Sequence, residues 1–116
     1  MDCLAGAPAT RCRMSDAVPE RLAPRGALPP DCSAYRTIGP FDAASLPQGL
    51  RSEHSLKPGV WGVLSLVEGA IGFVWDDSEG GREELTAPVD LVVPPQVLHH
   101  VEANEPFALS IAFHRA

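Results

Sequence analysis

The sequence lacks any apolar run near the ~20 residues that a transmembrane helix requires, so we expect no membrane span. Positive charge is also scarce, because nine Lys and Arg residues stand against fifteen Asp and Glu, for a formal net charge of −6. An acidic surface repels phosphate groups, which argues against nucleic acid as a partner. The same charge balance provides no basic patch for an anionic membrane.

Cysteine is sparse and its spacing is irregular. Cys3, Cys12 and Cys32 are the three cysteines, and all lie near the start of the chain. A disulfide framework requires an even count, and a zinc ribbon requires close cysteine pairs; the sequence has neither. The start of the chain also lacks the continuous apolar core of a signal peptide. We therefore expect reduced thiols in a cytoplasmic protein.

Residues 1–32 differ in composition from the remainder of the chain. They hold five of the twelve prolines, all the cysteines and no aromatic residue, so little apolar burial offsets the entropy of ordering them. We predict a flexible or irregular N-terminal extension over residues 1–32 and one domain over residues 33–116. Met14 is a second possible start, which leaves open whether residues 1–13 belong to the native protein.

From residue 33 onward, short runs of β-branched and aromatic residues are separated by Gly and Pro turn signals. We predict strands over residues 34–38, 50–54, 60–67, 70–75, 82–86, 91–93, 98–103 and 107–114, and one helical turn over 41–46. Glu68 and Gly69 are predicted to form the tight turn of a hairpin. We expect Asp76, Asp77 and Glu79 to form a solvated loop. This pattern favours an all-β sandwich or barrel.

The four histidines are the residues most able to carry chemistry. They are His54, His99, His100 and His114. Neutral imidazole binds zinc, iron and nickel, but spacing alone does not establish a metal site, and histidines that cap strand ends are the alternative. If His99 points inward, strand alternation turns His100 and Glu102 outward. We expect His100 and His114 to face solvent.

Four motifs follow one another along the chain: His54-x-x-Lys57-x-Gly59-x-Trp61-Gly62, Val67-Glu68-Gly69, Pro94-x-x-x-x-His99-x-Val101-Glu102 and Phe113-x-Arg115. Through these motifs, residues 33–115 resemble the small cupin family typified by the N-terminal domain of TehB tellurite-resistance proteins and by YeaR. Their order and spacing make the resemblance fairly specific.

The resemblance implies an all-β fold, a single cupin-like double-stranded β-helix or jelly-roll barrel. It also implies a divalent metal ion, zinc, iron or nickel, held by His54, His99 and Glu102. The sequence departs from the usual cupin pattern, because Gly59, Val60, Trp61 and Gly62 occupy positions where further ligands are expected. Leu56 also replaces a threonine of the family, and His114 replaces a tyrosine.

The function that the resemblance implies is binding of a metal, a small molecule or an oxyanion in a stress or oxyanion response. The alternative is a metal-dependent enzyme of the oxygenase or isomerase type, and a metal-free binding or homodimerisation module is a third reading. Three ligands facing a roomy pocket would favour the enzyme. Two histidines in a closed apolar lumen would favour binding. TehB proteins pair this kind of domain with a methyltransferase domain, for which 116 residues leave no room. We therefore expect this chain not to bind S-adenosylmethionine.

Overall fold

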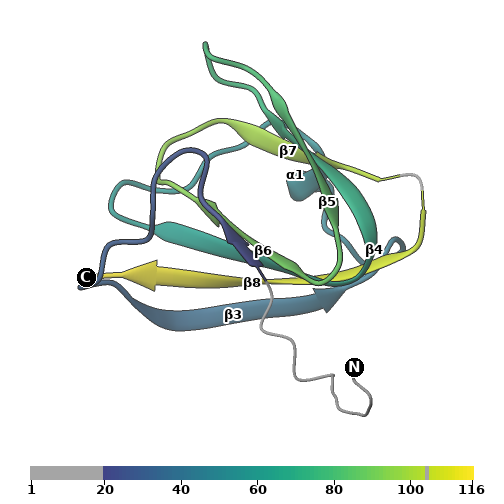
Figure 1. Cartoon of the computed structure of the whole chain (residues 1–116), viewed down its shortest axis with the longest axis horizontal. Coiled ribbons are helices and arrows are strands. Elements are labelled where there is room, and N and C mark those ends of the chain that lie inside the picture. The colour runs from purple at the N-terminus through teal and green to yellow at the C-terminus, as the bar shows by residue number, and fades with distance from the viewer. Residues whose placement is uncertain (1–19, 104) are drawn as a thin grey trace, which may run out of the picture.

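The protein folds as an all-β structure, as the sequence predicted. The computed structural model describes residues 20–103 and 105–116 (Figure 1). Its elements are β2 (Glu20–Leu22), β3 (Ser33–Phe41), α1 (Gln48–Arg51), β4 (Trp61–Trp75), β5 (Arg82–Thr86), β6 (Val89–Val93), β7 (His99–Glu102) and β8 (Phe107–Arg115). Within the described ranges, no helix has the length and apolar character needed to cross a membrane.

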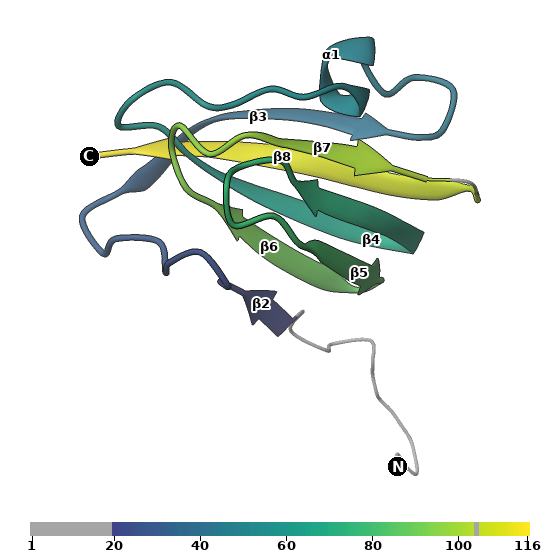
Figure 2. The same ribbon diagram turned by 90° about the horizontal axis from the view of Figure 1, so that it is seen from above.

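Strand β4 belongs to two sheets at once. Its first part pairs with β6 on one side and β8 on the other, and these strands continue to β2 and β3 at the two edges. Its second part, from Ala70 onward, pairs with β5 and β7. Figure 2 shows these strands from above, with β2 at the opposite edge from β3. The two sheets are therefore joined covalently through a single long strand.

The predicted hairpin at Glu68 and Gly69 is wrong, because the chain bends there without reversing. The register between β4 and β8 shifts between Leu66 and Glu68, which leaves Val67 as an extra, 58% exposed residue. Gly69 follows with φ of +79°. A bulge and a glycine can produce a sharp bend within a strand as well as a turn between strands. Glu68 and Gly69 therefore do mark a change of chain direction, but within one strand.

The segment before His54 also differs from its prediction. Residues 50–54 were expected to form a strand, whereas α1 occupies Gln48–Arg51 and His54 pairs in only a single bridge. Pro47 precedes α1 with φ of −58°, a value that proline favours and that suits entry into a helical turn. The expected helical turn over 41–46 is a tight turn in which the Asp42 carboxylate accepts hydrogen bonds from the backbone of Ala44 and Ser45.

Part of the predicted irregular extension is ordered against the domain. Strand β2 lies parallel to β6, with Leu22 opposite Leu91. The Arg25 guanidinium lies 4.6 Å from the centre of the Trp75 ring and forms an ion pair with Asp77. These contacts give residues 20–25 apolar and charged partners that composition did not reveal. Residues 1–19 lie outside the described part of the chain, so their predicted irregularity stays a prediction, as does the domain boundary at residue 33.

The core lies between the two sheets. The largest fully buried side chains are those of Phe73, Leu64, Leu66, Leu85, Leu91, Leu109 and Val92. Leu66, Leu85 and Leu109 alternate with exposed or half-buried residues along their strands, as in a sheet with one inner face. Each fully buried side chain of this kind stabilises the fold by about 1.5–3 kcal/mol. Both sheets contribute to the core, so their inner faces meet and leave room for a pocket at one end.

Candidate functional site

His54 and His99 are direct backbone partners. The His54 amide donates to the His99 carbonyl at 3.0 Å, and the His99 amide donates to the His54 carbonyl at 2.9 Å. Two residues that exchange both backbone bonds in an antiparallel bridge place their side chains on the same face. The two imidazole centres lie 4.2 Å apart, with the rings edge to face. The two histidine motifs therefore meet in space.

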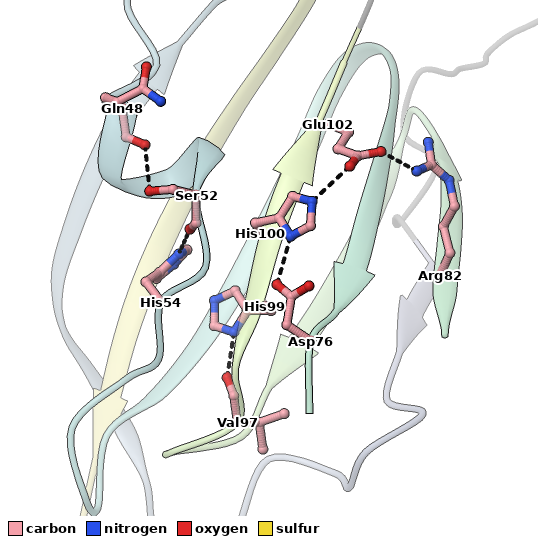
Figure 3. A network of polar contacts seen from close by, with 9 residues as sticks. All are labelled: Gln48, Ser52, His54, Asp76, Arg82, Val97, His99, His100 and Glu102. Carbon is pink, nitrogen blue, oxygen red and sulfur yellow. Dashed lines mark hydrogen bonds and ion pairs between the residues drawn. The ribbon is translucent and has the colours of Figure 1, made fainter. Parts of the chain in front are cut away.

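Each imidazole is oriented by a backbone carbonyl two residues earlier in the chain. His54 Nδ1 lies 3.0 Å from the Ser52 carbonyl, and His99 Nδ1 lies 2.7 Å from the Val97 carbonyl (Figure 3). A carbonyl can only accept, so each Nδ1 carries the hydrogen, and the neutral ring has its lone pair on Nε2. Ser52 is itself held by α1, because its hydroxyl donates to the Gln48 carbonyl at 3.2 Å.

The His99 ring is buried among aromatic side chains. It is 4% exposed and stacks on Phe73 with ring centres 5.0 Å apart, while Trp75 approaches edge-on at 6.4 Å. Burial, reinforced by the neighbouring His54, lowers the pKa of His99 to about 4. His99 is therefore neutral near pH 7, and its Nε2 can act as a metal ligand or a hydrogen-bond acceptor.

Both histidines line an apolar pocket of about 160 Å³ between the sheets. Its lining is Leu50, His54, Leu56, Gly62, Leu64, Phe73, Val93, His99, Val101, Ile111 and Phe113. The imidazoles are the polar side chains in this lining. A dry apolar cavity of about 150 Å³ is large enough for benzene, so the pocket suits a compact apolar group.

Glu102 does not join the two histidines. It lies on the outer face of β7, where it accepts a charged hydrogen bond from Arg82 and lies 2.8 Å from His100 Nε2. Arg82 reaches it by crossing over Gly72, where a Cβ atom would overlap the guanidinium. Strand alternation predicted this outward direction, and the motif resemblance pointed to the opposite one. The geometry follows the alternation.

His100 is part of an outer-face ion network, although it was expected to be a solvent-facing neighbour. Its Nδ1 lies 2.6 Å from Asp76, and its Nε2 contacts Glu102 (Figure 3). These bonds, Asp76 first, raise the pKa of His100, and His100 and Arg82 together lower the pKa of Glu102. The predicted loop is present and Glu79 is exposed in it, but Asp76 and Asp77 are half-buried and pair with His100 and Arg25. The His100-x-Glu102 alternation was the available signal for this network.

We expect the Asp76→Asn variant to have a lower His100 pKa than the wild type. The raised pKa means that the contact stabilises the fold fully below the ordinary pKa of 6.5 and that this contribution is lost as pH rises through the folded value. NMR titration of the His100 ring measures the change. Glu68→Gln removes one exposed negative charge elsewhere and should leave the His100 titration unchanged. An identical curve for Asp76→Asn and wild type would contradict this account.

His114 does not line the pocket that holds His54 and His99. It lies on β8 opposite Trp61, on the face away from the pocket that Phe113 lines, and it is half-buried where a surface position was expected. Its Nδ1 is buried without a hydrogen-bond partner among the described residues. In residues 20–103 and 105–116, no cluster of three or more His, Cys, Asp or Glu side chains is arranged to hold a metal. The donors that face the pocket are therefore the two imidazoles.

Comparison with known proteins bears on the family and the fold. A sequence model of the TehB-like domain matches residues 36–110, which include both pocket histidines. The crystal structure of TehB from Haemophilus influenzae superposes with a TM-score of 0.67 and 24% identity, over 74% of this chain and 32% of the TehB chain. A crystal structure of a protein from E. coli gives a TM-score of 0.70 and 24% identity, over 78% of this chain and 96% of that one.

These structural likenesses concern the fold alone, because both identities are below 25%. This chain also spans only about a third of the length of TehB. No curated protein matches the chain in sequence.

Proposed function

Because the chain belongs to the TehB-like domain family, we propose that it is a ligand-binding domain that holds a divalent metal ion between His54 and His99. One observation carries this proposal: each ring donates its Nδ1 hydrogen to a backbone carbonyl and keeps an Nε2 lone pair. Metal-ligating histidines are oriented in this way by their outer hydrogen bonds. Zinc, iron and nickel all accept such ligands.

The electrostatics of the pocket also suit a cation. Two Nε2 lone pairs repel a bare oxyanion, and the low pKa of His99 keeps that ring from becoming a positively charged donor near neutral pH. A bound divalent ion would supply the positive charge that attracts an anionic oxygen. This reasoning supports the stress or oxyanion-response role that the family resemblance implied.

The small number of donors favours a binding role over the enzyme alternative. Catalytic zinc sites usually present three protein ligands and an open position, whereas two described imidazoles face this pocket and Glu102 lies outside it. Water or a ligand would complete the metal shell. As part of the same proposal, the two sheets that share β4 form a cupin-type double-stranded β-helix similar to YeaR. The cytoplasmic location and a homodimer stay predictions.

Elemental analysis of the full chain, purified without a histidine tag, tests the metal proposal. We expect about one zinc, iron or nickel ion per wild-type chain and loss of at least ~90% of it in the His54→Ala, His99→Ala double variant, because each substitution removes one of the two protein ligands. Zinc titration by calorimetry should show the same loss.

A second double variant, His100→Ala with His114→Ala, is the matched control. It removes the same number of histidines outside the pocket and should retain the wild-type metal content. Equal metal in the wild type and the pocket variant would show that His54 and His99 do not hold it. Circular dichroism of each variant confirms that loss of metal is not loss of fold.

A further inference from the structure

A groove of about 280 Å³ lies beside the histidine pocket. Tyr35, Arg36, Ser55, Leu56, Lys57, Val60 and Phe113 line it. Leu56 and Phe113 line both the groove and the histidine pocket, so the two spaces are adjacent. We call this space the mouth groove.

Two cations flank the mouth groove. Arg36 lies opposite Phe113 in the β3–β8 register and shares its face of the sheet, while Lys57 begins the turn closed by the hydrogen bond from the Val60 amide to its carbonyl at 3.1 Å. Both side chains are exposed, and neither forms an ion pair with any residue in the described part of the chain. Their charges are therefore available to a ligand.

A third cation lies next to the same groove. The Arg115 guanidinium stacks over the Tyr35 ring, 4.1 Å from its centre, and Tyr35 is 44% exposed. Meanwhile, several of the acidic residues are paired on the other sheet, where Asp76, Glu84 and Glu102 bind His100 or Arg82. An acidic protein thus has a local cationic rim at one opening, and such a rim concentrates anions.

We propose that the mouth groove and the histidine pocket together bind a small organic monoanion. Its carboxylate pairs with Arg36 and Lys57, and its compact apolar body enters the pocket. Arginine and lysine form charge-assisted hydrogen bonds with carboxylates, and the apolar pocket lining takes up a hydrocarbon group without desolvating a charge. This inference goes beyond the proposed function, because it concerns the metal-free chain, in which the histidine pocket is open to the apolar body of the ligand.

The volumes agree with this division of the ligand. The pocket accommodates a group about the size of a six-membered ring, and the groove leaves space for a hydrated charged end. A small inorganic oxyanion would have to lose its hydration to enter the apolar pocket, which is costly. Without a metal ion, the shape and polarity of the pocket therefore favour an amphipathic acid over an inorganic anion.

Calorimetric titration of the metal-free full chain with benzoate, benzamide and selenite tests the inference. Benzoate should bind at least ~10-fold more tightly than its neutral isostere benzamide, because a hydrogen bond to a charged group contributes more than a neutral one. Arg36→Gln and Lys57→Gln should each weaken benzoate binding by about 3- to 10-fold and leave benzamide binding unchanged. Contacts in NMR spectra between the benzoate ring and Leu64 should report entry into the pocket.

Arg21→Gln is the matched control, because it removes the same charge from β2 at the far edge of the sheet and should leave benzoate binding unchanged. The inference would be overturned by equal affinity for benzoate and benzamide, or by no binding of either. It would also be overturned if neither Arg36→Gln nor Lys57→Gln weakened benzoate binding. Selenite binding as tight as benzoate and lost in the same variants would overturn the assignment to an organic acid.

The zinc titration reports separately on the proposed function. Arg36→Gln and Lys57→Gln leave His54 and His99 intact, so their zinc affinity should equal that of the wild type. If the wild type binds zinc normally but does not prefer benzoate to benzamide, the inference alone is rejected. Absence of zinc binding in the wild type would reject the metal proposal, whatever the benzoate result.

Discussion

Replacement of Gly69 by alanine is expected to reduce the free energy of unfolding by about 3 kcal/mol. Gly69 has φ of +79°, and a side chain in the left-handed region costs about 1–2 kcal/mol. Its Cβ would also overlap the Pro106 carbonyl oxygen and lie 2.9 Å from Phe107 Cα. Both atoms belong to the backbone that enters β8, so relief requires a shift of the strand, at a further ~1–3 kcal/mol. Urea unfolding measures the total.

Gly59→Ala is the matched comparison for this prediction. Gly59 has φ of +77°, nearly the same backbone conformation, but its Cβ would meet nothing within 4 Å. The reduction in the free energy of unfolding of Gly59→Ala should therefore be limited to the cost of the backbone conformation, about 1–2 kcal/mol. If the two variants were equally stable, the close approach of β4 to β8 at Gly69 would not be a constraint on the fold.

The bend at Gly69 shows why the strands could be predicted and their connection could not. Alternation and β-branched composition identified the residues on both sides of Gly69 as strands, because those signals are local. Whether a glycine after Glu68 reverses the chain or only bends it depends on the partner strands, β6 and β8 before it and β5 and β7 after it. Strand β2 was missed for the same reason, since its stability comes from β6.

Acidification from pH 7 to pH 4 is expected to reduce the unfolding free energy of the metal-free protein by about 3 kcal/mol through His99 alone. The pKa of His99 is about 4 in the folded protein against an ordinary 6.5, so the unfolded chain takes up the proton first. This contribution to stability is complete above pH 6.5. It is lost progressively as pH falls from 6.5 to about 4, and no more is lost below that value.

A comparison with His99→Gln isolates this effect from the other titrating groups. Glutamine can still donate a hydrogen bond to the Val97 carbonyl but does not titrate. Asp42, Asp77 and Glu102, whose pKa values are lowered, also lose stabilising interactions in acid, and they do so in both proteins. Urea midpoints at pH 7, 5 and 4 should fall more steeply for the wild type. Parallel declines in the two proteins would place the acid sensitivity outside His99.

The meeting of His54 and His99 was predictable, and its surroundings were not. The family resemblance predicted that the two histidines meet, whereas their spacing alone did not. Alternation predicted that Glu102 faces outward, but its Arg82 partner did not follow from the sequence, because it depends on Gly72 leaving a path for the guanidinium across the sheet. Likewise, the carbonyls of Ser52 and Val97 orient the imidazoles, and backbone groups leave no signature in residue type.

The sharing of β4 between both sheets has a consequence for fragments of this protein. Four strands, β5, β6, β7 and β8, pair with β4, so a chain cut within β4 would leave neither piece with a complete sheet. No half of the domain can therefore persist as a folded intermediate after such a cut, and two separately expressed pieces would regain structure only by associating. The domain should accordingly unfold in a single cooperative transition.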